Sequence, residues 1–295
     1  MSVGTVPVES AGALSTAGAE IRRREFLREL TRQKAFAIGV FIIGFWVLAA
    51  IFGTLFVQDP LAQNLSNINQ APSSAHLFGT DQLGRDVFAR VIVGSRPILI
   101  VAPLATLLGT VLGTALGLLM GYYRGAVDDV LGRFVEAFLA IPLVVTGILG
   151  VVALGSSKFA LIIIIGIVFT PLIARTVRAA VLVERDLDYV AAARLRGERS
   201  SYIMCAEILP NIMAPIAVEF TVRLGYAVFT IVTLSFLGFG IQPPTPNWGY
   251  DIAANVSGVT AGYWWEVLFA AAAIATVVIG VNMLANSIET ALDAS

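Results

Sequence analysis

The strongest constraint on this chain is a series of apolar runs, each long enough to cross a lipid bilayer as a helix. A helix needs about 20 apolar residues to span the hydrocarbon core. Only 13% of the residues are charged, against about 25% in soluble domains. The sequence therefore predicts an all-α polytopic membrane protein with six transmembrane helices, at roughly 35–57, 97–121, 134–154, 159–179, 212–240 and 266–288.

The positions of lysine and arginine predict the direction of these spans, because cytoplasmic loops of membrane proteins are enriched in both. If the N-terminus is cytoplasmic, six such residues precede the first span and two lie between the second and third spans. Six more fall between Arg175 and Arg199. The other side of the membrane holds only Arg85, Arg90, Arg96 and Lys158. We therefore expect both termini to be cytoplasmic.

This orientation divides the chain into five parts. We expect a cytoplasmic tail at 1–34, a first transmembrane helix at 35–57 and an extracytoplasmic segment at 58–96. A five-helix core at 97–288 carries a cytoplasmic loop at 184–211, and residues 289–295 form a cytoplasmic C-terminus.

Composition also excludes several functions. A net charge of −1 argues against binding to nucleic acid, which requires a strongly basic surface. Cys205 is the only cysteine and His76 the only histidine, so we expect no disulfide and no metal site. The chain has no phosphate-binding G-x-x-x-x-G-K-[ST] motif, so any use of ATP must depend on another chain.

One polar segment, Asp188–Asn211, interrupts the apolar sequence. It is rich in alanine, leucine and arginine, which favour helix formation. Asp188 as N-cap and Gly197 as C-cap predict a helix of about two turns, and a second helix is expected from Ser200 to Leu209. Two short helices that meet at a glycine form a rigid elbow. This elbow is either an amphipathic connector on the membrane surface or a docking element for a cytoplasmic partner.

The segment resembles the EAA loop of ABC importer permeases, through Tyr189–Arg194, Gly197 and Ile208–Asn211. Three features depart from the family pattern. Ala191 occupies the usual glutamate position, Glu207 replaces a usual histidine, and Leu195-Arg196-Gly197 stands in place of the usual A-L-G run. Three other segments resemble the dipeptide, oligopeptide and nickel branch, and its C-type subunit above all: Phe78–Pro97, Leu234–Gly249 and Asn282–Asp293.

The resemblance implies a type I ABC importer permease fold and a chain that transports but does not catalyse. The implied partners are a second permease, two cytoplasmic ATPase domains that bind ATP and Mg, an extracytoplasmic substrate-binding protein and membrane lipid. Di- or oligopeptides are the implied cargo, and the implied location is the plasma membrane of a prokaryote. The implied ATPase-coupling residues are Tyr189, Val190, Ala191, Ala192, Ala193, Arg194, Leu195, Arg196 and Gly197.

Other functions remain open from the sequence. The same machinery serves nickel or another small solute in related systems. A secondary transporter that works without ATP would have no need of a rigid cytoplasmic elbow. An integral-membrane enzyme would need clustered nucleophiles, bases or metal ligands at one depth, and the sequence shows no such cluster.

Two further groups of residues are candidates for a role inside the membrane. Glu219 and Arg223 are four residues apart, so they can pair on one helix face. They are candidates for the translocation path, for a structural ion pair or for an interfacial position. Helix packing is the expected role of a four-residue glycine repeat, at Gly109, Gly113, Gly117 and Gly121.

Polar and aromatic residues also mark the predicted outer side. Asp81, Arg85, Asp86 and Arg90 indicate a solvated amphipathic helix with local salt bridges, or a surface that faces partner proteins. Trp248, Trp264 and Trp265 are expected to anchor an outer membrane interface.

Overall fold

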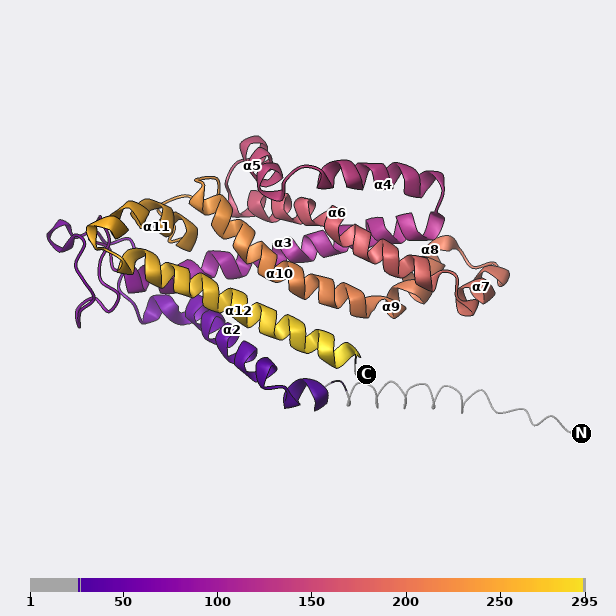
Figure 1. Ribbon diagram of the computed structural model, residues 1–295, viewed down its shortest axis with the longest axis horizontal. Coiled ribbons are helices and arrows are strands. Elements are labelled where there is room, and N and C mark those ends of the chain that lie inside the picture. Colours follow the sequence, from indigo (N-terminus) through magenta and orange to yellow (C-terminus); the bar gives the residue numbers. More distant parts are fainter. Residues whose placement is uncertain (1–25, 27, 294–295) are drawn as a thin grey trace, which may run out of the picture.

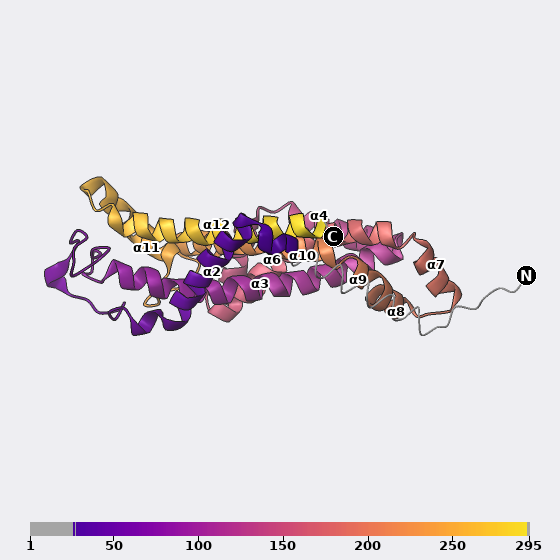
Figure 2. The same cartoon turned by 90° about the horizontal axis from the view of Figure 1, so that it is seen from below.

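The long apolar stretches form helices that lie side by side along one axis (Figures 1 and 2). The computed structural model describes Phe26 and residues 28–293. Most of the tail predicted at 1–34 lies outside the described residues. The long helices are α2 (Lys34–Phe52), α3 (Val87–Tyr123), α6 (Lys158–Glu184), α10 (Met213–Phe236) and α12 (Trp265–Asp293).

Shorter elements connect the long helices. α4 (Ala126–Leu139) and α5 (Leu143–Leu154) lie between α3 and α6, and α11 (Trp248–Asn255) lies between α10 and α12. At one end of the bundle, α6 is followed by α7 (Asp188–Leu195), α8 (Ser200–Tyr202), the π-helical turn η3 (Ile203–Ile208) and α9 (Leu209–Asn211). The remaining short turns are η1 (Gly53–Leu55), η2 (Leu65–Asn67) and η4 (Val256–Ala261).

Five helices in the described part of the chain are long and apolar enough to cross a membrane. They are Lys34–Leu55, Val87–Tyr123, Lys158–Glu184, Met213–Phe236 and Trp265–Leu292. The third predicted span, 134–154, is not one continuous helix. It belongs to the pair α4 and α5, which is bent by 91°. The break falls before Pro142, because proline disfavours a helical conformation in the residue that precedes it.

Helix α3 begins ten residues earlier than the span predicted at 97–121, so it extends into the segment predicted as 58–96. Its N-terminus is fixed by Asp86, whose carboxylate accepts a hydrogen bond of 2.8 Å from the backbone N–H of Ala89. Pro97 and Pro103 both lie inside α3. Each removes one backbone hydrogen bond without ending the helix.

A glycine face on α3 packs against α6. A Cβ atom added to any of its glycines would come within 2.6–2.9 Å of an atom of α6, so only glycine allows this approach. The contacts run along α6 from Gly166 to Val181. Close backbone approach of this kind is how helices associate in lipid, where packing replaces the hydrophobic drive. The glycines involved are Gly109, Gly113, Gly117 and Gly121.

The end of the bundle opposite α7 is closed by residues 59–86 together with α11, which we call the distal cap (Figure 1). The expectation of a solvated amphipathic helix here is wrong. Asp81 and Arg90 are only 1% and 3% exposed. Arg85 Nε lies 2.7 Å from Asp81 Oδ2, and Arg90 Nε lies 3.2 Å from an oxygen of Asp251 on α11. Buried charges persist only when they are paired, so this network fastens the cap.

The tryptophans of this region divide between core and surface. Trp248 and Trp265 are buried, and their ring N–H groups donate to the carbonyls of Val91 at 2.8 Å and Thr80 at 3.1 Å. Only Trp264 is exposed, at 48%. The prediction that all of them anchor a membrane interface is therefore wrong for Trp248 and Trp265, which tie the cap to α3 and α12.

Candidate functional site

Helix α7 projects at the end of the bundle opposite the distal cap (Figures 1 and 2). Val190 and Ala193 are fully buried against the rest of the chain. The opposite face exposes Ala191 and Ala192, and Leu195 is 90% exposed. A short helix with one buried face and one bare apolar face is anchored to the bundle and free to contact another molecule.

Aromatic contacts hold α7 in place. The hydroxyl of Tyr189 donates to Glu184 Oε2 at 2.6 Å, which links α7 to the end of α6. Burial and this carboxylate raise the pKa of Tyr189 to about 12. The guanidinium carbon of Arg194 lies 5.4 Å from the centre of the Tyr122 ring on α3. These contacts join α7 to both helices of the glycine-packed pair.

The C-terminus of α7 ends in a complete Schellman motif. The N–H of Gly197 donates to the carbonyl of Arg194 at 3.0 Å, and the N–H of Glu198 donates to Ala193 at 3.2 Å. Gly197 has φ of +75°, a conformation that glycine adopts without strain. The capping residue itself is Arg196, one position before the residue we predicted, and the N-cap is Leu187 rather than Asp188.

The second half of the elbow is helical but irregular. Instead of one α-helix over Ser200–Leu209, the chain forms α8, the π turn η3 and α9. Arg196 Nη2 lies 3.0 Å from Glu207 Oε1, so the π turn is tied back to the end of α7. Asn211 donates from its side chain to the carbonyl of Glu207 at 2.8 Å. The glutamate that departs from the family pattern therefore forms an ion pair within the elbow.

Arg185 connects the start of the elbow to the end of α3. Its guanidinium donates to the carbonyls of Gly121 at 3.2 Å and Tyr122 at 2.5 Å. Burial lowers the pKa of Arg185. Next to it, Arg124 lies 2.6 Å from Asp186, and the hydrogen bond from Arg124 lowers the pKa of that carboxyl. The elbow is thus bonded to the bundle on both sides of α7.

Glu219 and Arg223 lie together on α10, away from α7. Arg223 Nε donates to Glu219 Oε1 at 2.6 Å, and the guanidinium carbon lies 5.6 Å from the centre of the Tyr226 ring. The two side chains are 12% and 18% exposed. The structure brings this pair together but joins it to no residue of the elbow.

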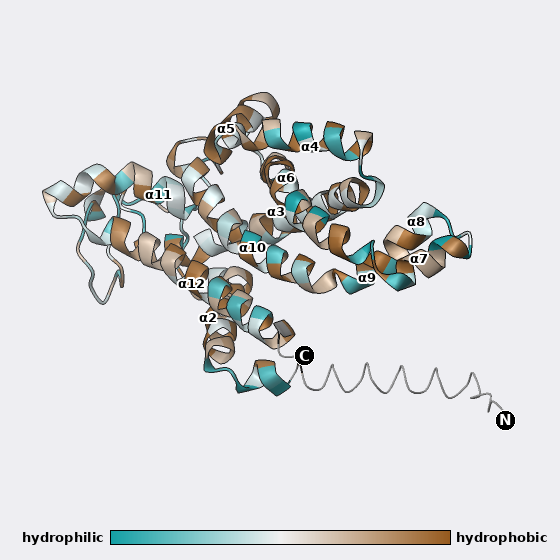
Figure 3. Cartoon of the chain, turned by 45° about the vertical axis from the view of Figure 1, so that its right-hand side comes forward, coloured by the Kyte–Doolittle hydropathy of each residue, from teal (hydrophilic) through white to brown (hydrophobic). Residues whose placement is uncertain are grey.

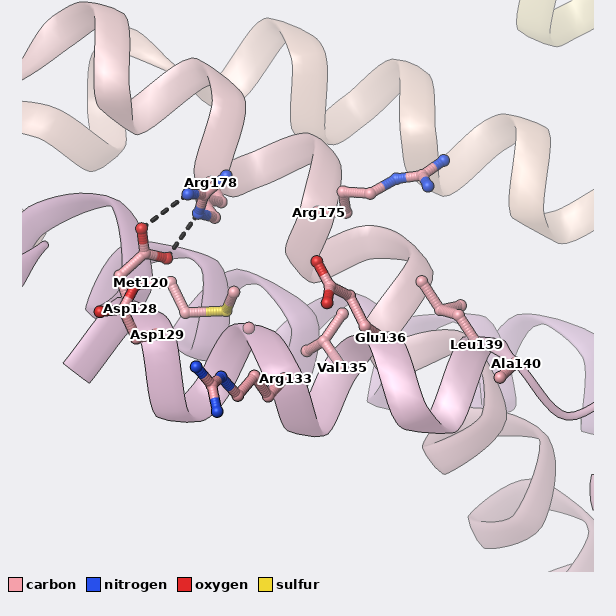
Figure 4. Close-up of a pocket in the computed structure, with 11 residues that line it drawn as sticks. Met120, Asp128, Asp129, Arg133, Val135, Glu136, Leu139, Ala140, Arg175 and Arg178 are labelled. Carbon is pink, nitrogen blue, oxygen red and sulfur yellow. Dashed lines mark hydrogen bonds and ion pairs between the residues drawn. The ribbon is translucent and has the colours of Figure 1, made fainter. Parts of the chain in front are cut away.

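A cavity of about 550 Å³ lies between α4 and α6, and the sequence reasoning did not predict it (Figure 4). Arg178 on α6 donates to both oxygens of Asp128 on α4 at 2.6 Å. The signal in the sequence is a charged stripe along α4, visible as hydrophilic turns beside the hydrophobic α5 (Figure 3). The other polar residues that line the cavity are Asp129, Arg133, Glu136 and Arg175.

This geometry offers a contact surface on the elbow and a charged cavity between α4 and α6. Among the described residues, no group of three or more histidine, cysteine, aspartate or glutamate side chains could hold a metal ion. The elbow presents a rigid apolar face, and the cavity presents charged side chains of both signs.

The chain belongs to the family described as binding-protein-dependent transport system inner membrane component, whose pattern matches residues 113–295. A second family, described as the N-terminal transmembrane domain of oligopeptide transport permease C, matches residues 22–72. With its apolar helices, the chain is a multi-pass inner membrane protein.

Among similar proteins, a dipeptide transport system permease protein of Alkalihalophilus pseudofirmus is 37% identical over 92% of this chain and 89% of its own length. Its counterpart in Bacillus subtilis is 33% identical over 90% of this chain and 83% of that protein. A glutathione transport system permease protein of Pectobacterium atrosepticum is 36% identical over 92% and 90%.

The fold is also similar to a solved structure of the MetNI methionine ABC transporter in an inward-facing conformation. The TM-score is 0.57 at 18% identity, and the match covers 69% of this chain and 96% of that one. This likeness shows the type I importer permease fold predicted from the sequence.

Proposed function

We propose that this chain is the membrane subunit of an ATP-driven importer for di- or oligopeptides. The similar permeases are named for dipeptides and for glutathione, itself a peptide. The observation that carries the proposal is α7, a helix bonded to the ends of α3 and α6 with Leu195 90% exposed. A helix placed in this way transmits displacement from a docked partner to the bundle.

The partners follow from that arrangement. Two cytoplasmic ATPase domains bind ATP and Mg, and the exposed face of α7 fits a groove on one of them. When the ATPases close, α7 moves as one body with α3 and α6, because a hydrogen bond joins it to α6 and a cation–π contact joins it to α3. A second permease completes the passage, and a binding protein delivers the peptide. The helices then alternate between inward-facing and outward-facing arrangements, and this chain performs no catalysis.

The test is a substitution on the exposed face of α7. Leu195→Glu places a charge in the proposed interface without touching the core. We therefore expect the amount of ATPase that co-purifies with the chain, and the rate of ATP-dependent peptide uptake, each to fall at least tenfold. The matched control is Leu77→Glu, because Leu77 is 59% exposed in the distal cap. Equal retention of ATPases by both variants would rule out α7 as the docking helix.

A further inference from the structure

The cavity between α4 and α6 extends along both helices, away from the end of the bundle that carries α7 (Figure 1). Arg175 lies nine residues before the end of α6, which is about 14 Å along the helix. Glu136 lies near the far end of α4, about 15 Å from its first residue. Ionisable side chains at such depth occur where they face a water-filled cavity or a partner. Since the side chains of both helices line one cavity (Figure 4), water is the environment that accounts for them.

The two faces of α4 differ in polarity, and the charged face is the one that lies toward the cavity. On the cavity side lie the adjacent Asp128 and Asp129 and, about two helical turns further on, Glu136. The other side carries Val130 and Phe134, which are 68% and 65% exposed. An amphipathic helix with this pattern separates an aqueous space from an apolar one. The polar face therefore lines a passage, and the apolar face lies toward lipid or another subunit.

The charges in the cavity comprise one ion pair that fastens two helices and four charges that form no ion pair within the described chain, which we call the free charges. Arg178 and Asp128 bind each other through two hydrogen bonds of 2.6 Å, which fastens α4 to α6. No ion pair within the described chain involves the four remaining charged side chains that line the cavity, which are Asp129, Arg133, Glu136 and Arg175. Two are positive and two negative, so the free charges balance.

We propose that this cavity is the cytoplasm-facing, water-filled half of the peptide path, and that its balanced free charges select for zwitterionic peptides over those with a net charge. The inference rests on the proposed function, and it names the residues of α4 and α6 that would line the peptide path. A zwitterionic peptide presents one ammonium and one carboxylate group, which Glu136 or Asp129 and Arg175 or Arg133 complement. A volume of about 550 Å³ is within the range of small-molecule sites.

Water in the cavity can be tested by cysteine labelling in the assembled complex. Cys205 is the only cysteine of this chain, so Cys205→Ser removes its thiol, and labelling is followed on this chain after it is separated from the other subunits. In inside-out vesicles, we expect Glu136→Cys to react with a membrane-impermeant thiol reagent at least tenfold faster than Phe134→Cys, because Glu136 lines the cavity and Phe134 lies on the opposite face of α4. Equal, slow reaction of both cysteines would overturn the assignment of the cavity as an aqueous passage.

Charge selection is tested by the uptake of three dipeptides that are neutral, acidic or basic overall. We expect Arg175→Glu to shift the ratio of basic to acidic peptide uptake at least fivefold in favour of the basic one. Arg32→Glu is the control, because Arg32 is an exposed arginine that does not line the cavity. An unchanged ratio in Arg175→Glu, with ATPase subunits still bound, would overturn the proposed selection.

These measurements also separate the two proposals. If the unaltered complex takes up no peptide, the proposed function and the charge selection both fail, whereas rapid labelling of Glu136→Cys would still support a water-filled cavity. If uptake is intact and labelling is slow, the proposed passage alone is wrong.

Discussion

Arg90 on α3 and Asp251 on α11 form a buried ion pair although 161 positions separate them in the sequence. Arg90 Nε lies 3.2 Å from Asp251 Oδ1, and a second donor, Arg90 Nη1, bonds the carbonyl of Pro60 at 3.3 Å. One guanidinium therefore joins α3 to two parts of the distal cap, α11 and the segment at Pro60. This arrangement gives a prediction that separates buried from exposed ion pairs.

Replacing Arg90 with alanine leaves Asp251 buried without its partner. Because removal of one member of a buried pair strands the other, we expect Arg90→Ala to lower the stability of the protein by about 3–5 kcal/mol. The matched control is Arg124→Ala, since Arg124 and Asp186 are 46% and 56% exposed and such pairs contribute less than about 1 kcal/mol. Thermal unfolding in detergent measures both, and similar losses would contradict the assigned burial.

Acid should partly rescue Arg90→Ala. Burial raises the pKa of Asp251 above its usual value even with Arg90 present, so the folded protein binds a proton there more tightly than the unfolded chain. Stability linked to such a group is present at low pH and is lost as the pH rises through the raised pKa. Unfolding midpoints measured from pH 4 to 8 should show the variant converging on the wild type toward the acidic end, and a gap that is constant or widens there would count against this account.

The effect of a substitution at Gly197 should depend only on how readily the new residue adopts a positive φ. A Cβ atom at this position meets no atom within 4 Å, but φ is +75°, which costs a non-glycine residue about 1–2 kcal/mol. We expect ATP-driven uptake to decline in the order Gly197→Asn, Gly197→Ala, Gly197→Val, since asparagine adopts positive φ most readily and β-branched residues least. Uptake per ATP hydrolysed is the measurement, and equal coupling in all three would show that the Schellman motif does not matter.

The glycine face of α3 predicts a contrast between two identical substitutions. A Cβ atom at Gly117 would lie 2.7 Å from an atom of Val177, whereas one at Gly44 on α2 meets nothing within 4 Å. We expect Gly117→Ala to destabilise the protein by about 1–3 kcal/mol through overpacking. Gly44→Ala should be neutral or stabilise it by up to about 1 kcal/mol, because alanine favours the helix. Unfolding midpoints of the two variants measure this contrast, and equal midpoints would contradict the close packing at Gly117.

The bond between Tyr189 and Glu184 gives the elbow a response to alkaline pH. The pKa of Tyr189 is raised to about 12, from about 10 in an unfolded chain. The stabilisation is therefore complete below about pH 10 and is lost as the pH rises towards 12. At pH 8 we expect Tyr189→Phe to be less stable than the wild type by about 1 kcal/mol, the net value of one hydrogen bond. The difference should shrink between pH 10 and 12, and a constant difference would contradict the shifted pKa.

Much of the architecture was predictable because apolar length and periodicity act locally. Runs of about 20 apolar residues located the long helices, and the four-residue spacing of glycines identified the face of α3 that packs on α6. The elbow was predictable for the same reason, since a helix end and a positive-φ glycine depend on neighbouring residues. Only the positions of its caps and the π turn at 203–208 differed.

The remaining features depend on contacts between distant residues. Asp81 and Arg90 look like surface charges in the sequence, and only the position of Asp251 on α11 shows that they are buried. The cavity was missed because 134–154 was treated as one apolar span, which hid the charged stripe that begins at Asp128. Its lining is complete only when Arg175 and Arg178 of α6 come to face that stripe.

Because of the bend before Pro142, neither α4 nor α5 alone is long enough to span the membrane. Helix α4 follows the bundle axis, but α5, with 12 residues, lies at 91° to α4. This position in the bundle therefore has no continuous membrane-spanning helix. A passage formed by one copy alone would not be enclosed by helices on this side. We therefore expect enclosure to be shared with a neighbouring subunit, which makes tightness toward ions and peptides a property of the assembly.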